Sequence, residues 1–254
     1  MKYLTADIRT QKDVAFLVKR YYAIQKDRIT MGHQIRTAQE LGEPYEAFQW
    51  LFDHYSFMEA ELKKALGRYA EDHPVGRWMM SHKGMGPVLA AGMLAYVDIE
   101  RAVTPGHILS YGNMAGTPRR AVKGSMRDWN ADFKCLLWKI GESFVKASGR
   151  KQAYYGQWYA KHKRDIAERN DRKEFAYLAQ EAKVGKNTEA YKYYSQGKLP
   201  PAHVHAMARR KAIHLFVHHF WEKMYKYHFK KKPKLKPWVV EHQDKVYIEP
   251  FEIE

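Results

Sequence analysis

The chain has 254 residues, and its 44 lysines and arginines exceed its 28 aspartates and glutamates, which leaves a formal net charge of +16 at pH 7. A charge of this size indicates a polyanionic partner, first a phosphate polymer and second an anionic membrane surface. The content of 45% hydrophobic and 14% aromatic residues excludes a disordered chain, and the single cysteine, Cys135, excludes a disulfide framework and a cysteine-based zinc site. No signal peptide follows Met1 and no apolar run approaches the ~20 residues that span a bilayer, so a soluble cytoplasmic protein is expected.

Two long amphipathic helices are predicted in the first 75 residues. Apolar and aromatic side chains recur at intervals of three and four residues over 14–38 and again over 46–69, and Arg28 interrupts the first series. Gly42 and Pro44 separate the two helices. The pattern favours an antiparallel arm, either closed within one chain or pairing with a second copy into a homodimer through residues 14–69.

A helix-hairpin-helix is predicted at the start of the next region, residues 76–149. Gly84 and Gly86 flank an apolar Met85 between two short helices, so the backbone can turn sharply while the methionine fills the gap between the helices. Free amides at a helix N-terminus attract anions, and Pro87 suits the first turn because no N–H is needed there. We therefore expect this turn to bind the phosphate backbone of DNA; a glycine-rich turn without a ligand is the alternative. The expected contacts are Lys83, Gly84, Met85, Gly86 and Val88.

Further helices complete a mainly all-α fold. Asn130 can cap a helix over 131–147, a weaker pattern covers 154–168, and Pro200 and Pro201 open a long helix over 202–229. We expect residues 150–229 to extend the domain of residues 76–149, and residues 230–254 to form a basic tail. Strand signals are confined to short alternating stretches at 2–8 and 245–253, which predict short terminal strands.

Two further clusters of cations could hold phosphate groups. A loop beside Trp129 carries four, which either clamp phosphate or face solvent, and the long C-terminal helix carries three more. His214 and His218 in that helix have the four-residue spacing of metal ligands, but no third ligand stands nearby and we expect no metal. The seven expected contacts are Arg119, Arg120, Lys123 and Arg127 in the loop and Arg209, Arg210 and Lys211 in the helix.

Between residues 78 and 221 the order of these motifs resembles a known family. The chain reads GMGPVLAAGML at the hairpin, SYGNMAG at the end of a short helix, then a basic glycine-containing loop and N-x-x-x-K-x-L-L from Asn130. AHVHAMARRKAIHLFVHHFW follows near the C-terminus. This series is similar to the C-terminal transposase domain of the insertion-sequence-110 family, the DEDD transposases related to Piv-type DNA invertases, several of which are guided by a bridge RNA. The resemblance implies a bacterial, archaeal or phage mobile element and a role in DNA transposition or recombination.

Two departures from the family bear on catalysis. Members of the family carry an N-terminal RuvC-like domain with four metal-binding carboxylates, whereas only Asp7 could correspond to one of them here, so we expect that domain to be absent. The family's catalytic serine aligns with Arg120 or Ala121, and Ser125 could replace it only through a shifted register.

The sequence therefore predicts a nucleic-acid-binding protein, with DNA as the first ligand, structured RNA as a further ligand and no membrane partner. It is expected to be non-catalytic on its own and to need no cofactor, acting as a relic, an accessory subunit or the partner of a separate nuclease. Two alternatives stay open. One is an active serine-dependent recombinase that uses Ser125 and Mg²⁺, and the other is an oligomeric assembly protein built through the N-terminal arm.

Overall fold

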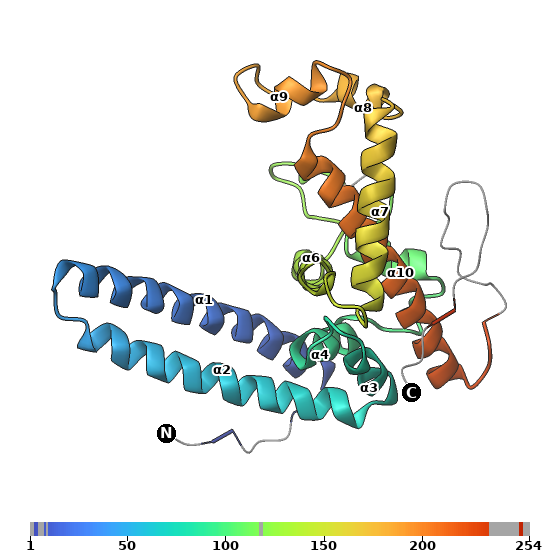
Figure 1. The fold of residues 1–254 in the computed structure, drawn as a ribbon. Helices are drawn as coiled ribbons and strands as arrows, with labels where there is room; N and C mark the ends of the chain where they lie inside the picture. Colours follow the sequence, from blue (N-terminus) through green and yellow to red (C-terminus); the bar gives the residue numbers. More distant parts are fainter. Residues whose placement is uncertain (1–2, 5–7, 9, 117–118, 234–248, 251–254) are drawn as a thin grey trace. The chain divides into compact units, whose positions relative to one another are not determined.

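The computed structural model describes residues 3–4, 8, 10–116, 119–233 and 249–250, and within these residues the protein is all-α (Figure 1). That part of the chain contains ten helices and no strand. The two expected terminal strands lie largely outside the described residues, and the few residues described within them are not in strands. The expected basic tail is described only at 230–233 and 249–250. No described helix is both long and apolar enough to cross a lipid bilayer.

The chain forms two compact units. Unit 1 comprises Met1–Ser81 and Gly86–Arg101, and unit 2 comprises His82–Met85 and Ala102–Glu254. The division passes through the hairpin predicted from the sequence, because the two helices of the hairpin belong to unit 1 and its turn belongs to unit 2.

Unit 1 is an antiparallel pair of long helices with two short helices at one end (Figure 1). α1 (Gln11–Leu41) and α2 (Glu46–Asp72) lie side by side, and Gly42 ends α1 with a φ of +69°. α3 (Pro74–Ser81) follows α2, and α4 (Pro87–Tyr96) contacts both α1 and α2. α1 and α2 thus pair with each other within one chain, and pairing of the arm with a second copy stays a prediction.

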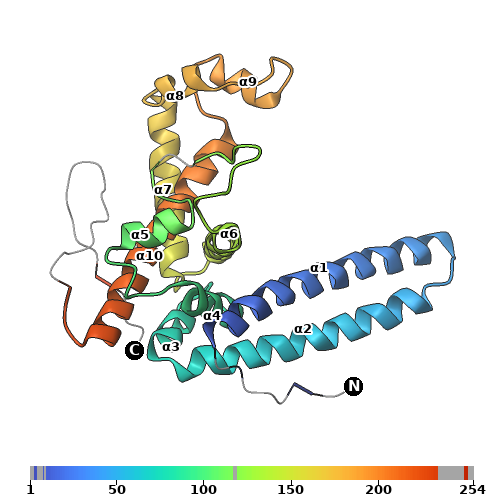
Figure 2. The ribbon, with the colours of Figure 1, turned by 180° about the vertical axis from the view of Figure 1, so that it is seen from behind.

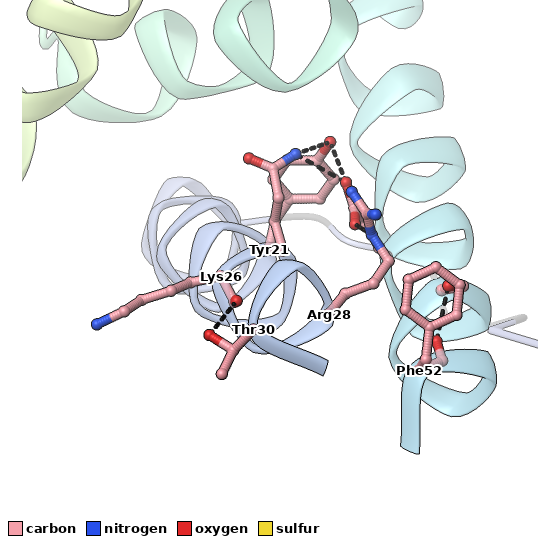
Figure 3. Close-up of polar contacts among 8 residues, drawn as sticks. Tyr21, Lys26, Arg28, Thr30 and Phe52 are labelled. Atoms are coloured by element: carbon pink, nitrogen blue, oxygen red, sulfur yellow. Dashed lines mark hydrogen bonds and ion pairs between the residues drawn. The ribbon is translucent and has the colours of Figure 1, made fainter. Parts of the chain in front are cut away.

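A polar layer crosses the α1–α2 interface where Arg28 interrupts the apolar repeat (Figure 3). The Arg28 Nε donates to Glu59 Oε2 at 2.5 Å, and the guanidinium lies 5.9 Å from the centre of the Phe52 ring. Gln25 Nε2 and the Tyr21 hydroxyl donate to the other carboxylate oxygen at 2.8 and 3.0 Å. Burial opposes the ionisation of Glu59, but these hydrogen bonds outweigh it and lower the pKa of the carboxyl. The charge that breaks the repeat therefore has its partner inside the arm.

Unit 2 is built around the antiparallel pair α7 (Tyr154–Asp171) and α10 (Pro201–Phe229), which lie side by side in Figure 2. α6 (Ala131–Ala147) packs against both, and α5 (Pro105–Tyr111) packs against α10. Asn130 caps α6, as expected, by accepting a hydrogen bond from the Phe133 N–H. The connection from α7 to α10 contains α8 (Ala176–Glu181) and α9 (Glu189–Tyr194).

The core of unit 2 is rich in aromatic rings. Tyr155 is fully buried, with Phe144 stacked on it at 4.8 Å and Phe216 edge-on at 5.4 Å between ring centres. These rings come from α7, α6 and α10. Because aromatic packing of this kind is close and specific, it fixes the three helices and therefore the side chains on their outer faces.

Candidate nucleic-acid interface

The turn of the predicted hairpin is anchored in unit 2 through Gly84. Its φ is +101°, a conformation that favours glycine, and an added Cβ would lie 3.1 Å from Cδ1 of the buried Phe144. The Gly84 carbonyl accepts a hydrogen bond from the Ser143 hydroxyl at 2.6 Å. Met85 is 4% exposed, and its N–H donates to the His82 carbonyl at 3.0 Å. The turn is therefore a fixed part of the packed unit.

The residues expected to hold DNA at this hairpin differ in their access to solvent. Lys83 is exposed, Gly84 and Gly86 are partly exposed, and Met85 is buried. Gly86 caps α4 with extended backbone and provides no side chain to accept from the first amides of the helix. Val88, which would supply one of those amides, is buried as well. The structure thus leaves Lys83 open to a ligand but encloses Met85 and Val88.

The loop between α5 and α6 is exposed throughout residues 119–128 and is held in shape by Arg119. The Arg119 guanidinium donates to Asp128 Oδ2 and to the Ser110 carbonyl, both at 2.6 Å. The Arg119 N–H donates to Asn113 Oδ1 at 2.8 Å, and Asn113 Nδ2 donates to the Arg119 carbonyl at 2.9 Å. Arg119 therefore acts mainly within the loop, where Asp128 offsets its charge.

Three cations of this loop have no such partner. Arg120, Lys123 and Arg127 are exposed, and their side chains form no ion pair or hydrogen bond with any residue that the structure describes. Ser125 is also exposed, and its N–H donates to the Val122 carbonyl at 3.2 Å. Among the described residues, no carboxylate or imidazole contacts the Ser125 hydroxyl, so the base that a serine nucleophile needs is absent from that set.

The three cations of α10 also differ from one another. Arg209 pairs with Glu142 on α6, and its guanidinium lies 5.3 Å from the centre of the Trp138 ring. Burial and the neighbouring Arg209 lower the pKa of Arg210, although a guanidinium keeps its charge at neutral pH. Lys211 is partly exposed. Arg209 thus positions an indole, whereas Arg210 and Lys211 both act on His214 of the same helix.

His214 connects the base of the loop to α10. Its Nε2 donates to the carbonyl of Met114, which shortly precedes Arg119, at 2.8 Å. Burial lowers the pKa of this imidazole; the bond to Met114 opposes the shift, and the charge of Arg210 one helical turn away adds to it. The two basic clusters, which lie far apart in the sequence, are therefore neighbours within unit 2.

Two tryptophans stand among these cations. The centre of the Trp129 ring lies 5.7 Å from the Arg119 guanidinium and 5.6 Å from Lys134 Nζ. Sequence reasoning pointed to Trp129 but missed Lys134 and Trp138, although their place outside the apolar stripe of α6 was a usable signal. We refer to the whole set as the basic–aromatic surface: Arg119, Arg120, Lys123, Arg127, Trp129, Lys134, Trp138, Arg209, Arg210 and Lys211.

The two histidines of α10 that have metal-ligand spacing are partly buried. Burial lowers the pKa of His218 to about 4, and His214 beside it adds to the effect, so the His218 imidazole is neutral at neutral pH. Since a carbonyl can only accept, the bond to Met114 places a proton on Nε2 of His214 and leaves that nitrogen no lone pair for a metal. The described part of the chain holds no group of three or more histidine, cysteine, aspartate or glutamate side chains that could bind a metal ion.

The net charge of the protein is confined to unit 2. Unit 1 contains 13 lysines and arginines and 13 aspartates and glutamates, whereas unit 2 contains 31 and 15. Residues 102–127 include four of the cations of the basic–aromatic surface and no acidic residue. The formal charge of +16 therefore belongs to the unit that carries this surface.

No family model matches this chain, and no curated protein or solved structure matches it at a significant level. The similarity to transposase domains thus stays a prediction from sequence motifs. The function has to be inferred from the geometry and the charge of unit 2.

Proposed function

We propose that the protein binds nucleic acid, with DNA as its main ligand, through the basic–aromatic surface. The observation that carries the proposal is the exposed loop of residues 119–128, in which Arg120, Lys123 and Arg127 pair with no described residue while Arg119 holds the loop in shape. A loop of this kind can neutralise backbone phosphates without first breaking ion pairs of its own.

The distribution of charge supports this ligand. Because unit 1 is formally neutral and unit 2 carries +16, a polyanion is attracted to the unit that bears the exposed cations. Phosphate binding of this type releases counterions, so the affinity must fall steeply with salt. A role in DNA transposition or recombination is proposed from the resemblance of residues 78–221 to transposase domains.

The proposal is limited to binding. Ser125 lies on the same exposed loop, but a hydroxyl that no described base contacts is a weak nucleophile at neutral pH. Strand cleavage would then fall to a separate nuclease, with this protein holding the DNA beside it.

The test measures binding of a fluorescently labelled DNA duplex by anisotropy between about 50 and 200 mM salt. We expect tight binding at low salt and a steep linear fall of log affinity with log salt. Removal of the three exposed cations of the loop should weaken binding and reduce the steepness of that fall by roughly 2 to 3, because each phosphate contact contributes about 0.9. The variant is Arg120→Gln/Lys123→Gln/Arg127→Gln.

A matched control removes the same number of exposed cations from unit 1. It should bind the duplex as the wild type does, because its lysines lie in the neutral unit. If both triple variants lose the same amount of affinity, the loop is not part of the interface. If the affinity of the wild type does not change with salt, the protein does not bind through phosphates. The control is Lys12→Gln/Lys26→Gln/Lys63→Gln.

A further inference from the structure

Trp138 is an exposed indole held in a fixed position. It is 46% exposed, whereas Trp221 of the same unit is 2% exposed. The Arg209 guanidinium covers one face of the Trp138 ring at 5.3 Å and is itself fixed by Glu142, one turn further along α6. An indole that is supported on one face and open over nearly half of its surface can stack on a second planar group.

A lysine of α6 and a second indole just before the helix continue this feature. Lys134 and Trp138 are four residues apart, so they occupy the same face of the helix, about 6 Å apart along its axis. Lys134 Nζ also lies 5.6 Å from the centre of the Trp129 ring. Trp129, Lys134 and Trp138 therefore form a row of alternating aromatic and cationic groups, with Arg119 against its first ring and Arg209 against its last.

We propose that this row binds single-stranded nucleic acid, whose bases stack on Trp129 and Trp138 while the intervening phosphates lie against Lys134. The inference rests on the proposed function and deepens it by naming an unpaired strand as the ligand of this part of the surface. Indole rings stack on bases that have left the double helix, whereas exposed cations bind the phosphates of either form. DNA and RNA strands share this chemistry, because stacking does not depend on the sugar.

The experiment compares three labelled ligands by anisotropy: oligothymidylate, oligouridylate and a DNA duplex. Trp138→Leu should weaken binding of the single strands by roughly tenfold, because loss of one stacked base has an effect of that order. Binding of the duplex should stay within about twofold, since its phosphates are held by the exposed cations of the loop. Trp138→Phe should keep most of the single-strand affinity because it keeps an aromatic face.

The matched control is Trp50→Leu, which removes an indole that is 60% exposed on α2 of unit 1. It should leave all three affinities unchanged. Circular dichroism should show unaltered helix content in each variant, and the phenylalanine variant keeps the test decisive if the leucine variant folds poorly.

The outcomes of this experiment distinguish a failure of the stacking inference from a failure of the proposed function. Suppose that the wild type binds all three ligands. Base stacking is then refuted if Trp138→Leu leaves all three affinities unchanged, or if it weakens duplex binding as much as single-strand binding. The proposed function stands in both cases. If Trp138→Phe loses as much affinity as Trp138→Leu, the aromatic face is not the contact and the inference also fails. Loss confined to one of the two oligonucleotides supports the stacking row and assigns the strand to DNA or to RNA. If the wild type binds none of the ligands, the proposed function itself fails.

Discussion

Arg119 and Arg209 each contact a carboxylate and an indole at the same time. Arg119 bonds to an aspartate of its own loop and lies 5.7 Å from the centre of the Trp129 ring. Arg209 pairs with a glutamate of α6 and lies 5.3 Å from the centre of the Trp138 ring. A guanidinium donates through its edge and stacks through its face, so the two contacts are compatible. Both arginines therefore orient indoles, and the charge that is free to meet a phosphate lies on other residues.

At the same scale, Gly84→Ala should lower the free energy of unfolding by about 2 to 3 kcal/mol, because the new Cβ adds backbone strain and crowds a packed core. The φ of +101° disfavours any side chain, and the crowded neighbour is the fully buried Phe144. Urea denaturation followed by circular dichroism measures the change.

Gly86→Ala is the matched control within the same turn. Its backbone is extended, with a φ of −93°, and nothing lies within 4 Å of the added Cβ. The expected loss is below about 1 kcal/mol, the effect of a poorer helix cap. Equal losses at the two glycines would show that the turn is not anchored as described.

At the scale of the helix pair, the polar layer of the arm fixes how α1 is aligned with α2. Arg28, Gln25 and Tyr21 on α1 all converge on Glu59 of α2. A slip of one helix along the other would leave Arg28 and Glu59 without each other inside the interface, which is costly for partly buried charges. The layer therefore favours one register of α1 against α2, in the way that a polar residue sets register in a coiled coil.

Glu59→Leu should lower the free energy of unfolding by roughly 2 kcal/mol, because it leaves Arg28 partly buried without its carboxylate. The double variant Arg28→Leu/Glu59→Leu should be more stable than Glu59→Leu alone, since no unpaired charge remains. Urea denaturation compares these variants with Glu40→Leu, which changes an exposed glutamate of α1 and should have little effect. A double variant less stable than Glu59→Leu would contradict this account of the layer.

At the scale of the whole molecule, the two units differ in net charge. Unit 1 balances 13 cations with 13 acidic residues, and the entire excess of +16 belongs to unit 2. A long-range attraction to a polyanion therefore acts on one unit. Exposed cations of the neutral unit 1 therefore provide internal controls for charge variants of unit 2.

Lysine acetylation read by mass spectrometry tests this division on the intact protein. Bound DNA should reduce the modification of Lys123 and Lys134 several-fold, because phosphate contacts shield their amines. Lys12 and Lys63, which are exposed in unit 1, should be modified at the same rate with and without DNA. Uniform protection across both units would argue against a ligand confined to unit 2.

The helices were predictable because their signals are local. α6 spans residues 131–147 as predicted, because both its cap at Asn130 and the spacing of its apolar residues can be recognised within one short segment of the sequence. The helices predicted over 14–38, 46–69 and 202–229 agree with α1, α2 and α10 to within a turn. The exposed cations of the loop and Trp129 could also be selected in advance, because a run of basic residues without acids is visible in the sequence.

The sequence by itself thus determined the all-α class, the positions of the long helices and the excess of positive charge. Only the tertiary structure decided which cations are available: Arg119 and Arg120 are identical neighbours, yet Arg119 is bound to Asp128 and Arg120 pairs with no residue that the structure describes. It also decided that the excess belongs to one unit, and that Arg209 pairs with a glutamate 67 residues away. The physical reason is that helix formation depends on neighbours in the chain, whereas ion pairing and the support of an exposed indole depend on residues that only folding brings together.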